Sequence, residues 1–147
     1  MTSGAIDVAM VRRHLAALDV AVQTLRRHTG RPADLLRTDI EEAWVVERGL
    51  QLCAQNCLDV ATHLAASAGH DVPDYATAID TLGTMGVLTP EFTRGFRGIA
   101  GFRNIVVHGY LAVDHDLLHR LLNERLADFV AFAATIEEHL ASPTAGR

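Results

Sequence analysis

The chain has 147 residues, of which 49% are hydrophobic and 5% aromatic, and only 4 are proline. This length suffices for a domain with its own core, and the composition favours helices packed through aliphatic side chains over a β-sandwich. The formal net charge of −5 argues against a protein that coats nucleic acid with a positive field, although it permits a local basic site.

No apolar run reaches the roughly 18 residues that a membrane-spanning helix requires. The first residues lack a basic segment followed by an apolar one, so we expect no signal peptide. We therefore predict a cytoplasmic protein with no membrane partner. Residues 1–147 are expected to form a single domain, with a frayed tail from about residue 141.

The first half of the chain predicts two long helices. Apolar residues recur at steps of three and four within residues 6–28, which is the spacing of one helical face. Thr38 or Asp39 is a suitable cap for a second helix over residues 40–68, which Gly69 would end.

The second predicted helix has apolar residues on more than one side. One stripe along it is polar: Arg48, Gln55, Asp59 and Thr62. Such a stripe is either the wet face of the helix or the lining of a polar cleft, and the spacing alone leaves both interpretations open.

A short helix is predicted over residues 76–84, followed by a turn at residues 85–86. Thr89 then caps a fourth helix with Pro90 at its first position, where the missing N–H costs nothing. We expect this helix to continue to about Val107.

Three glycines recur at every third position of the fourth predicted helix: Gly95, Gly98 and Gly101. Each weakens a helix by roughly 1 kcal/mol relative to alanine, so we expect another helix to approach closely in compensation. Asp114 is a suitable cap for a last helix over residues 115–140. The predicted fold is an all-α antiparallel bundle of four long helices and one short helix.

Two pairs of potential metal ligands occur at a spacing of four residues: Cys53 with Cys57, and His115 with His119. A closed zinc site takes four ligands, and no further ligands can be assigned to either pair. We therefore interpret the cysteines as buried apolar fillers and the histidines as part of a solvated helix start. No metal and no cofactor are predicted.

Residues 101–114, GFRNIVVHGYLAVD, place a cation, an imidazole and a phenol around an apolar run. In a continuous helix, Arg103 and His108 would lie about 7.5 Å apart along the axis and about 140° apart around it. Gly109 can loosen the helix there, so Arg103, His108 and Tyr110 can converge at its end.

These residue types suit phosphate chemistry. Guanidinium matches phosphate oxygens and stays charged, and imidazole moves a proton near neutral pH. Because the 2′-hydroxyl of RNA is an internal nucleophile, Arg103 and His108 would suffice for strand cleavage without a metal, with Asn104 orienting the phosphate or the imidazole. The same residues are also consistent with a purely structural helix end.

The order Arg, four residues, His, one residue, Tyr, with a polar residue after the Arg, resembles the signature of the HepT-like toxin branch of the HEPN superfamily. VVERGLQLCAQNCLDVATHLAA resembles the second helix of that branch, and LGTMGVLTPEF its loop into the motif helix. The resemblance implies a metal-independent endoribonuclease toxin of a type VII toxin–antitoxin pair. It also implies a homodimer whose two motif helices meet at a shared cleft.

The resemblance implies a role for each motif residue. Arg103 would stabilise the phosphate, His108 would transfer a proton, and Asn104 would be the polar helper. Tyr110 would accept AMP from the partner, an MntA-like nucleotidyltransferase antitoxin. Two residues of the polar stripe become candidates for shaping the cleft: Arg48 and Asp59.

A second interpretation from a different class is kept open. In it the chain is a catalytically silent HEPN module that dimerises and binds nucleotide or docks a nucleotidyltransferase. The motif residues would then serve only as ligand contacts. The intact Arg, Asn, His and Tyr favour the ribonuclease.

Overall fold

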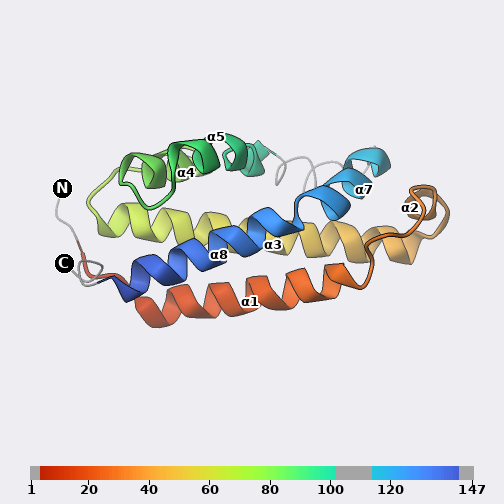
Figure 1. Ribbon diagram of the computed structural model, residues 1–147, viewed down its shortest axis with the longest axis horizontal. Helices are drawn as coiled ribbons and strands as arrows, with labels where there is room; N and C mark the ends of the chain where they lie inside the picture. Colours follow the sequence, from red (N-terminus) through yellow and green to blue (C-terminus); the bar gives the residue numbers. More distant parts are fainter. Residues whose placement is uncertain (1–3, 102–113, 143–147) are drawn as a thin grey trace.

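The structure, a computed structural model, describes residues 4–101 and 114–142. Every regular element in these ranges is a helix, which confirms the predicted all-α fold (Figure 1). The helices are α1 (Val8–Arg26), α2 (Leu35–Thr38), α3 (Ile40–Ser67), α4 (Tyr75–Thr84), α5 (Pro90–Phe96), α7 (His115–Glu124) and α8 (Leu126–Ala141). Residues 99–101 are helical as well.

Helix α3 runs through the middle of the molecule. Its start is fixed by Asp39, whose Oδ1 accepts the backbone N–H groups of Glu41 and Glu42 at 3.1 and 3.2 Å. It ends before Gly69, which has φ of +88° and so takes the left-handed conformation that glycine adopts without strain. Both predicted ends of this helix are confirmed. In Figure 1, α1 and α8 lie on one side of α3, and α4 and α5 lie on the other.

The core is built mainly from one face of α1 and several faces of α3. On α1 the buried residues are Val11, Leu15, Leu18, Ala21, Val22 and Leu25, which is the apolar face that the sequence predicts. Cys53 and Cys57 of α3 are fully buried free thiols in this core. Burial raises the pKa of Cys53 to about 12 and the pKa of Cys57 well above its ordinary value. The prediction of buried cysteines is confirmed.

The fourth helix does not run unbroken toward Val107 as predicted. Thr89 caps it through Oγ1 and Pro90 starts it, as expected, but α5 ends at Phe96 and a turn follows at residues 97–98. Gly95 and Gly98 lower the helix propensity around this turn. The side chain of Arg97 also forms an ion pair with Asp80 of α4. The predicted continuation to Val107, on which the spacing of Arg103 and His108 was calculated, falls on residues outside the described ranges.

The last predicted helix is in fact two helices, α7 and α8, which meet at Arg125. The N–H of Arg125 still bonds the carbonyl of Leu121 at 3.0 Å, but its φ and ψ of −113° and −4° depart from the values of a regular α-helix. Asp114 caps α7 as predicted, since its Oδ1 accepts the N–H of Leu117 at 2.9 Å. The break turns α8 to run beside α1 (Figure 1).

The expected close approach of a helix to Gly95, Gly98 and Gly101 is not found among the residues that the structure describes. Among the described residues, no heavy atom lies within 4 Å of a Cβ built at any of the three. The close approaches occur elsewhere. A Cβ at Gly49 would meet Leu25 at 2.5 Å, and one at Gly83 would meet Thr93 at 2.6 Å.

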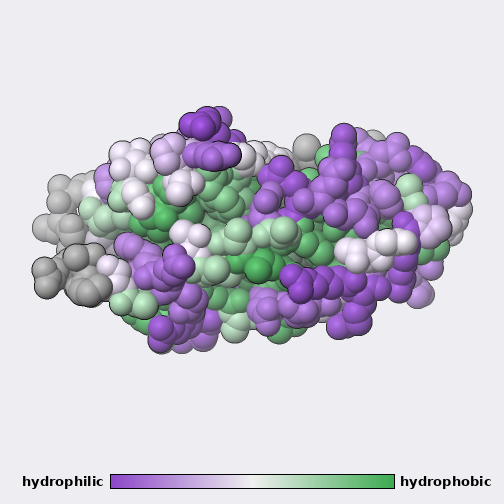
Figure 2. Space-filling view, in the orientation of Figure 1, coloured by the Kyte–Doolittle hydropathy of each residue, from purple (hydrophilic) through white to green (hydrophobic). Residues whose placement is uncertain are grey.

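The surface divides into apolar and hydrophilic regions. Figure 2 shows apolar surface over the middle of the face on which α8 and α5 lie, and hydrophilic surface toward the end that carries α2 and α7. Between α1 and α3 runs an apolar groove of about 600 Å³, where Val20 and Trp44 are 67% and 60% exposed. In residues 4–101 and 114–142 no helix combines the length and hydropathy that crossing a bilayer requires.

Candidate functional site

The predicted motif falls in residues 102–113, outside the described residues. Its members are Arg103, Asn104, His108 and Tyr110. The described chain reaches this stretch from α5 and leaves it into α7. On either side of this stretch, described residues hold the chain in place.

On the incoming side, a two-bond ion pair ties the chain to α4. Nε and Nη2 of Arg97 donate to Oδ1 and Oδ2 of Asp80 at 2.9 and 3.0 Å, and this pairing raises the pKa of Arg97. Ile99, two residues further on, is only 6% exposed and belongs to the core. The chain is thus fixed both by charge and by packing before residue 102.

On the outgoing side, α7 is held at its first turn. After the Asp114 cap, Leu118 is buried in the core, and Arg37 of α2 pairs with Asp116. The first turn therefore contacts both the core and α2.

The two histidines of α7 face different groups. Nε2 of His119 donates to the carbonyl of Arg31 at 3.1 Å, which joins α7 to the loop after α1. His115 lies near Glu47 of α3, whose pKa is raised by burial and lowered in part by the charge of His115. In the part of the chain that the structure describes, no three side chains of the metal-binding types gather.

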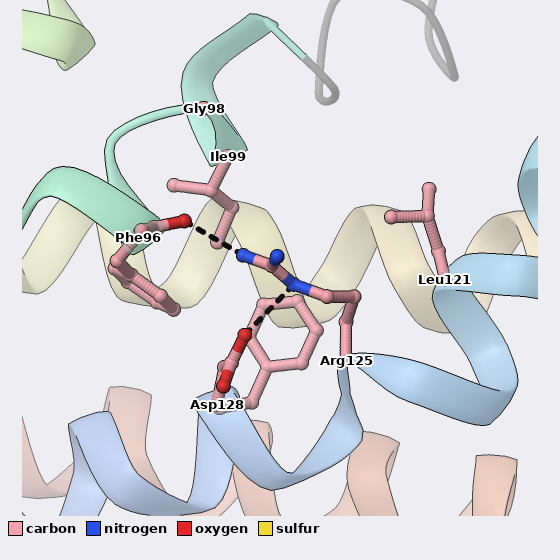
Figure 3. Close-up of a pocket in the computed structure, with 8 residues that line it drawn as sticks. Phe96, Gly98, Ile99, Leu121, Arg125 and Asp128 are labelled. Atoms are coloured by element: carbon pink, nitrogen blue, oxygen red, sulfur yellow. Dashed lines mark hydrogen bonds and ion pairs between the residues drawn. The ribbon is translucent and has the colours of Figure 1, made fainter. Parts of the chain in front are cut away.

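A cavity of about 210 Å³ lies between α5 and the α7–α8 break (Figure 3). Its lining is Gly95, Phe96, Gly98, Ile99, Leu121, Arg125, Asp128 and Phe129. Nη2 of Arg125 donates to the carbonyl of Gly95 at 2.7 Å, and its Nε lies 2.7 Å from Oδ2 of Asp128. This one guanidinium therefore links the helix before the motif stretch to the two helices after it.

The polar stripe of α3 lies in two environments. Arg48 is exposed at the apolar groove, where its Nη1 donates to Gln51 at 3.2 Å. Asp59 is partly buried and accepts from Nε2 of Gln55 at 2.8 Å; the same nitrogen lies 3.2 Å from the hydroxyl of Tyr75 of α4. Eleven residues of helix separate Arg48 from Asp59 by about 16 Å, so the structure does not bring these two side chains together.

Sequence reasoning missed Arg125 and Asp128. Both lie in what the sequence presents as one long amphipathic helix, where an arginine and an aspartate three residues apart usually form an ordinary surface pair. The available signal was their position beside Leu126 and Phe129, which are both buried. A charged pair next to two buried residues is a sign of a partly enclosed site.

The fold places the chain in a known structural class. It is similar to the tri-AMPylated HEPN toxin of Shewanella oneidensis, solved in complex with an MNT antitoxin, with a TM-score of 0.79 over 88% of this chain and 97% of that one, at 20% identity. It is also similar to YutE of Bacillus subtilis, a cytosolic protein of unknown function, with a TM-score of 0.81 over 97% and 96% of the two chains, at 17% identity. The helical bundle is thus a HEPN-type fold.

Within this class the family can be stated. Residues 18–136 match the family model described as ribonuclease HepT-like, and the chain belongs to this family. One relative is the tRNA nuclease HepT of Aphanizomenon flos-aquae, 23% identical over 137 residues and 92% of both chains. Another is the mRNA nuclease HepT of Shewanella oneidensis, 26% identical over 89 residues, which are 60% of this chain and 67% of that one. The resemblance seen in the sequence is confirmed.

Proposed function

We propose that this chain is an endoribonuclease toxin whose partner is an MntA-like nucleotidyltransferase antitoxin. One observation carries the proposal: the family match over residues 18–136 spans the Arg-x4-His-x-Tyr order of residues 103–110. Relatives in this family are named nucleases of tRNA and of mRNA, and structures of similar fold are toxin–antitoxin complexes with MntA.

The proposed reaction uses the 2′-hydroxyl of RNA as nucleophile. A bond forms between the 2′-oxygen and phosphorus, the bond from phosphorus to the 5′-oxygen breaks, and the proton passes from the 2′-oxygen to the leaving 5′-oxygen. Arg103 would stabilise the negative charge that grows on the phosphoryl oxygens, His108 would carry the proton, and Asn104 would orient one of them. This sequence of steps requires no metal ion.

The active unit is proposed to be a homodimer, in which the motifs of two copies share one cleft. A shared cleft would concentrate arginine side chains in a protein whose net charge is −5. Sedimentation equilibrium tests this part, and a single species at the mass of one chain over the concentration range of the cleavage assay would contradict it.

Inhibition is proposed to act on Tyr110. The antitoxin would transfer AMP from ATP to the phenolic oxygen, forming a bond to the α-phosphorus and releasing pyrophosphate. The added phosphates would compete with RNA for Arg103 by the electrostatics that govern phosphorylation switches. The support is that a toxin of similar fold is tri-AMPylated in complex with its antitoxin.

The test is cleavage of total RNA and tRNA by purified protein in EDTA, after mass spectrometry shows that Tyr110 carries no adduct. Arg103→Ala and His108→Ala are compared with wild type. Matched controls are Arg94→Ala and His70→Ala, which remove an exposed arginine and an exposed histidine elsewhere. Cleavage by the wild type and both controls, with loss in both motif variants, is the expected result.

Two outcomes would contradict the proposal. Equal cleavage by the motif variants would mean that the motif residues do not perform the reaction. No cleavage of any RNA by the unmodified dimer would favour a silent HEPN module that binds nucleotide or docks a nucleotidyltransferase.

A further inference from the structure

We propose that the apolar groove between α1 and α3 binds a second copy of this chain, with the two α3 helices antiparallel across a twofold axis that passes between Trp44 and Val45. The inference rests on the proposed function, because it assigns a surface to the homodimer proposed there. Every residue that it uses lies in α1 or α3, on the described part of the chain.

The groove gathers exposed apolar side chains. Of the six large apolar side chains that are exposed in residues 4–101 and 114–142, three line this groove: Val20, Trp44 and Val45. Exposed apolar patches of this kind mark interaction sites, and tryptophan is among the residues that contribute most to the affinity of protein interfaces. The groove therefore suits a protein partner.

The two walls of the groove differ in shape. Helix α3 contributes the large, rigid ring of Trp44, whereas α1 contributes small side chains, among them Ala17, Ala21 and Thr24. Because a twofold axis repeats every contact, Trp44 of each copy can enter the groove of the other. A surface that carries both a large exposed side chain and a hollow is complementary to itself.

Two charged residues flank the apolar part of α3 on its exposed side. Glu41 and Arg48 are both exposed, and neither makes an ion pair within the part of the chain that the structure describes. They lie seven residues apart, which is two helical turns and about 10.5 Å along the axis, so they point to the same side of the helix. Trp44 and Val45 lie between them on that side.

This charge pattern favours a second copy in one orientation. The proposed axis is equally distant from Glu41 and Arg48 along the helix, so an antiparallel pair places Glu41 of each copy opposite the partner's Arg48. The ion pair then forms twice. A parallel pair would place like charges opposite each other, which weakens association. An unrelated partner would need no such symmetry.

The first experiment measures the dissociation constant of the dimer by sedimentation equilibrium of the full chain. Glu41→Arg and Arg48→Glu each turn both ion pairs into like-charge pairs and should raise this constant at least about tenfold. An equimolar mixture of the two variants restores opposite charges at both positions, so it should dimerise within about threefold of the wild type. The matched controls, Glu138→Arg on α8 and Arg94→Glu on α5, change exposed charges elsewhere and should keep the wild-type constant.

The second experiment tests the apolar anchor. Trp44→Ala should also raise the dissociation constant at least about tenfold, because the side chain is lost twice in each dimer. Val130→Ala, which truncates an exposed apolar residue of α8, is the matched control. At concentrations at which the wild type is monomeric, circular dichroism and thermal unfolding of Trp44→Ala should match those of the wild type, whereas a purely structural role would lower its stability.

The outcomes separate this surface from the proposed function. Unchanged dissociation constants in all three variants would overturn the surface and leave the homodimer to another face. Monomeric single variants that do not associate when mixed would overturn the antiparallel pairing. If Trp44→Ala keeps the dimer but loses a nucleotidyltransferase that the wild type binds, the groove docks the antitoxin and the proposal is wrong. A dimer that behaves as expected but cleaves no RNA would contradict the ribonuclease and leave the surface standing.

Discussion

At the scale of single residues, burial decides what the two cysteines can do. Burial raises the pKa of Cys53 to about 12, so at pH 8 only about one thiol in ten thousand is ionised, and the thiolate is the form that reacts. We predict that a disulfide reagent at pH 8 modifies the native protein only as fast as the protein unfolds. In denaturant, two thiols per chain should react at once. Rapid modification of the native state would contradict the buried positions.

The same shift predicts how stability depends on pH. The pKa of both thiols is raised in the folded state, so above the ordinary pKa of 9.0 the unfolded chain loses protons that the folded chain keeps. The free energy of unfolding should therefore fall as the pH rises above about 9. A Cys53→Val, Cys57→Ala variant should show a smaller fall over the same range, measured by urea unfolding at pH 7 and pH 10.

Glu42 is a buried carboxylate whose two oxygens contact a histidine and an arginine. It is 8% exposed, and its two oxygens lie 2.7 Å from Nδ1 of His28 and from Nη1 of Arg31. We predict that Glu42→Gln lowers the free energy of unfolding by about 1.5–3 kcal/mol, because hydrogen bonds to a charged group are replaced by weaker ones. The neighbouring, exposed Glu41→Gln is the matched control and should change it by less than about 1 kcal/mol. Equal effects of the two substitutions in denaturant titrations would show that the buried contact contributes nothing.

At the scale of elements, the glycines separate into two kinds. A methyl group at Gly83 would meet Oγ1 and Cγ2 of buried Thr93 at 2.6 and 2.9 Å, whereas one at Gly95 would meet no described atom within 4 Å. We predict that Gly83→Ala destabilises the protein by about 1–3 kcal/mol by pushing α4 from α5, while Gly95→Ala stabilises it by up to about 1 kcal/mol. Thermal unfolding of both variants checks the signs, and a stabilising Gly83→Ala would contradict the close α4–α5 packing.

Helix starts and stops were predictable because they depend on local chemistry. Asp39, Thr89 and Asp114 cap their helices through their own side chains, and Gly69 and Gly86 have the positive φ that ends a helix or makes a turn. The breaks after Phe96 and at Arg125 were not predictable in this way, since each accompanies a side-chain contact with a distant element. Arg97 reaches Asp80, and Arg125 reaches Gly95, 30 residues away in the sequence.

The candidate site likewise has a part that the sequence predicts and a part that it does not. Arg103, Asn104, His108 and Tyr110 could be proposed from sequence because they lie close together in a recognisable order. The cavity could not be proposed, since its walls are brought together only by the packing of α5 against α7 and α8. Arg48 and Asp59 share a stripe in sequence, yet α4 covers the stripe near Asp59 and leaves Arg48 exposed.

At the scale of the whole molecule, the charge limits how RNA can be bound. With a net charge of −5, an RNA complex must depend on a few local cations and on base contacts. We predict that the logarithm of RNA affinity falls with the logarithm of salt concentration with a slope of only about −2 to −3, as for three or four phosphate contacts to a single strand. The measurement is a titration of His108→Ala protein, which the proposed mechanism makes inactive, with single-stranded RNA at several salt concentrations. A slope steeper than about −6 would indicate a broad cationic surface that the composition does not provide.

The central position of α3 also has a consequence for hydrogen exchange. Five other helices pack on its 28 residues, and 14 of these are buried, whereas α7 buries only Leu118 and Leu122. Amides in the middle of α3 should exchange only when the whole molecule unfolds, and those of α7 should exchange through local opening at much lower free energy. A ligand bound in the cavity beside α7 should then slow hydrogen exchange in α7 by a larger factor than in α3. This difference alone would locate the bound ligand at α7.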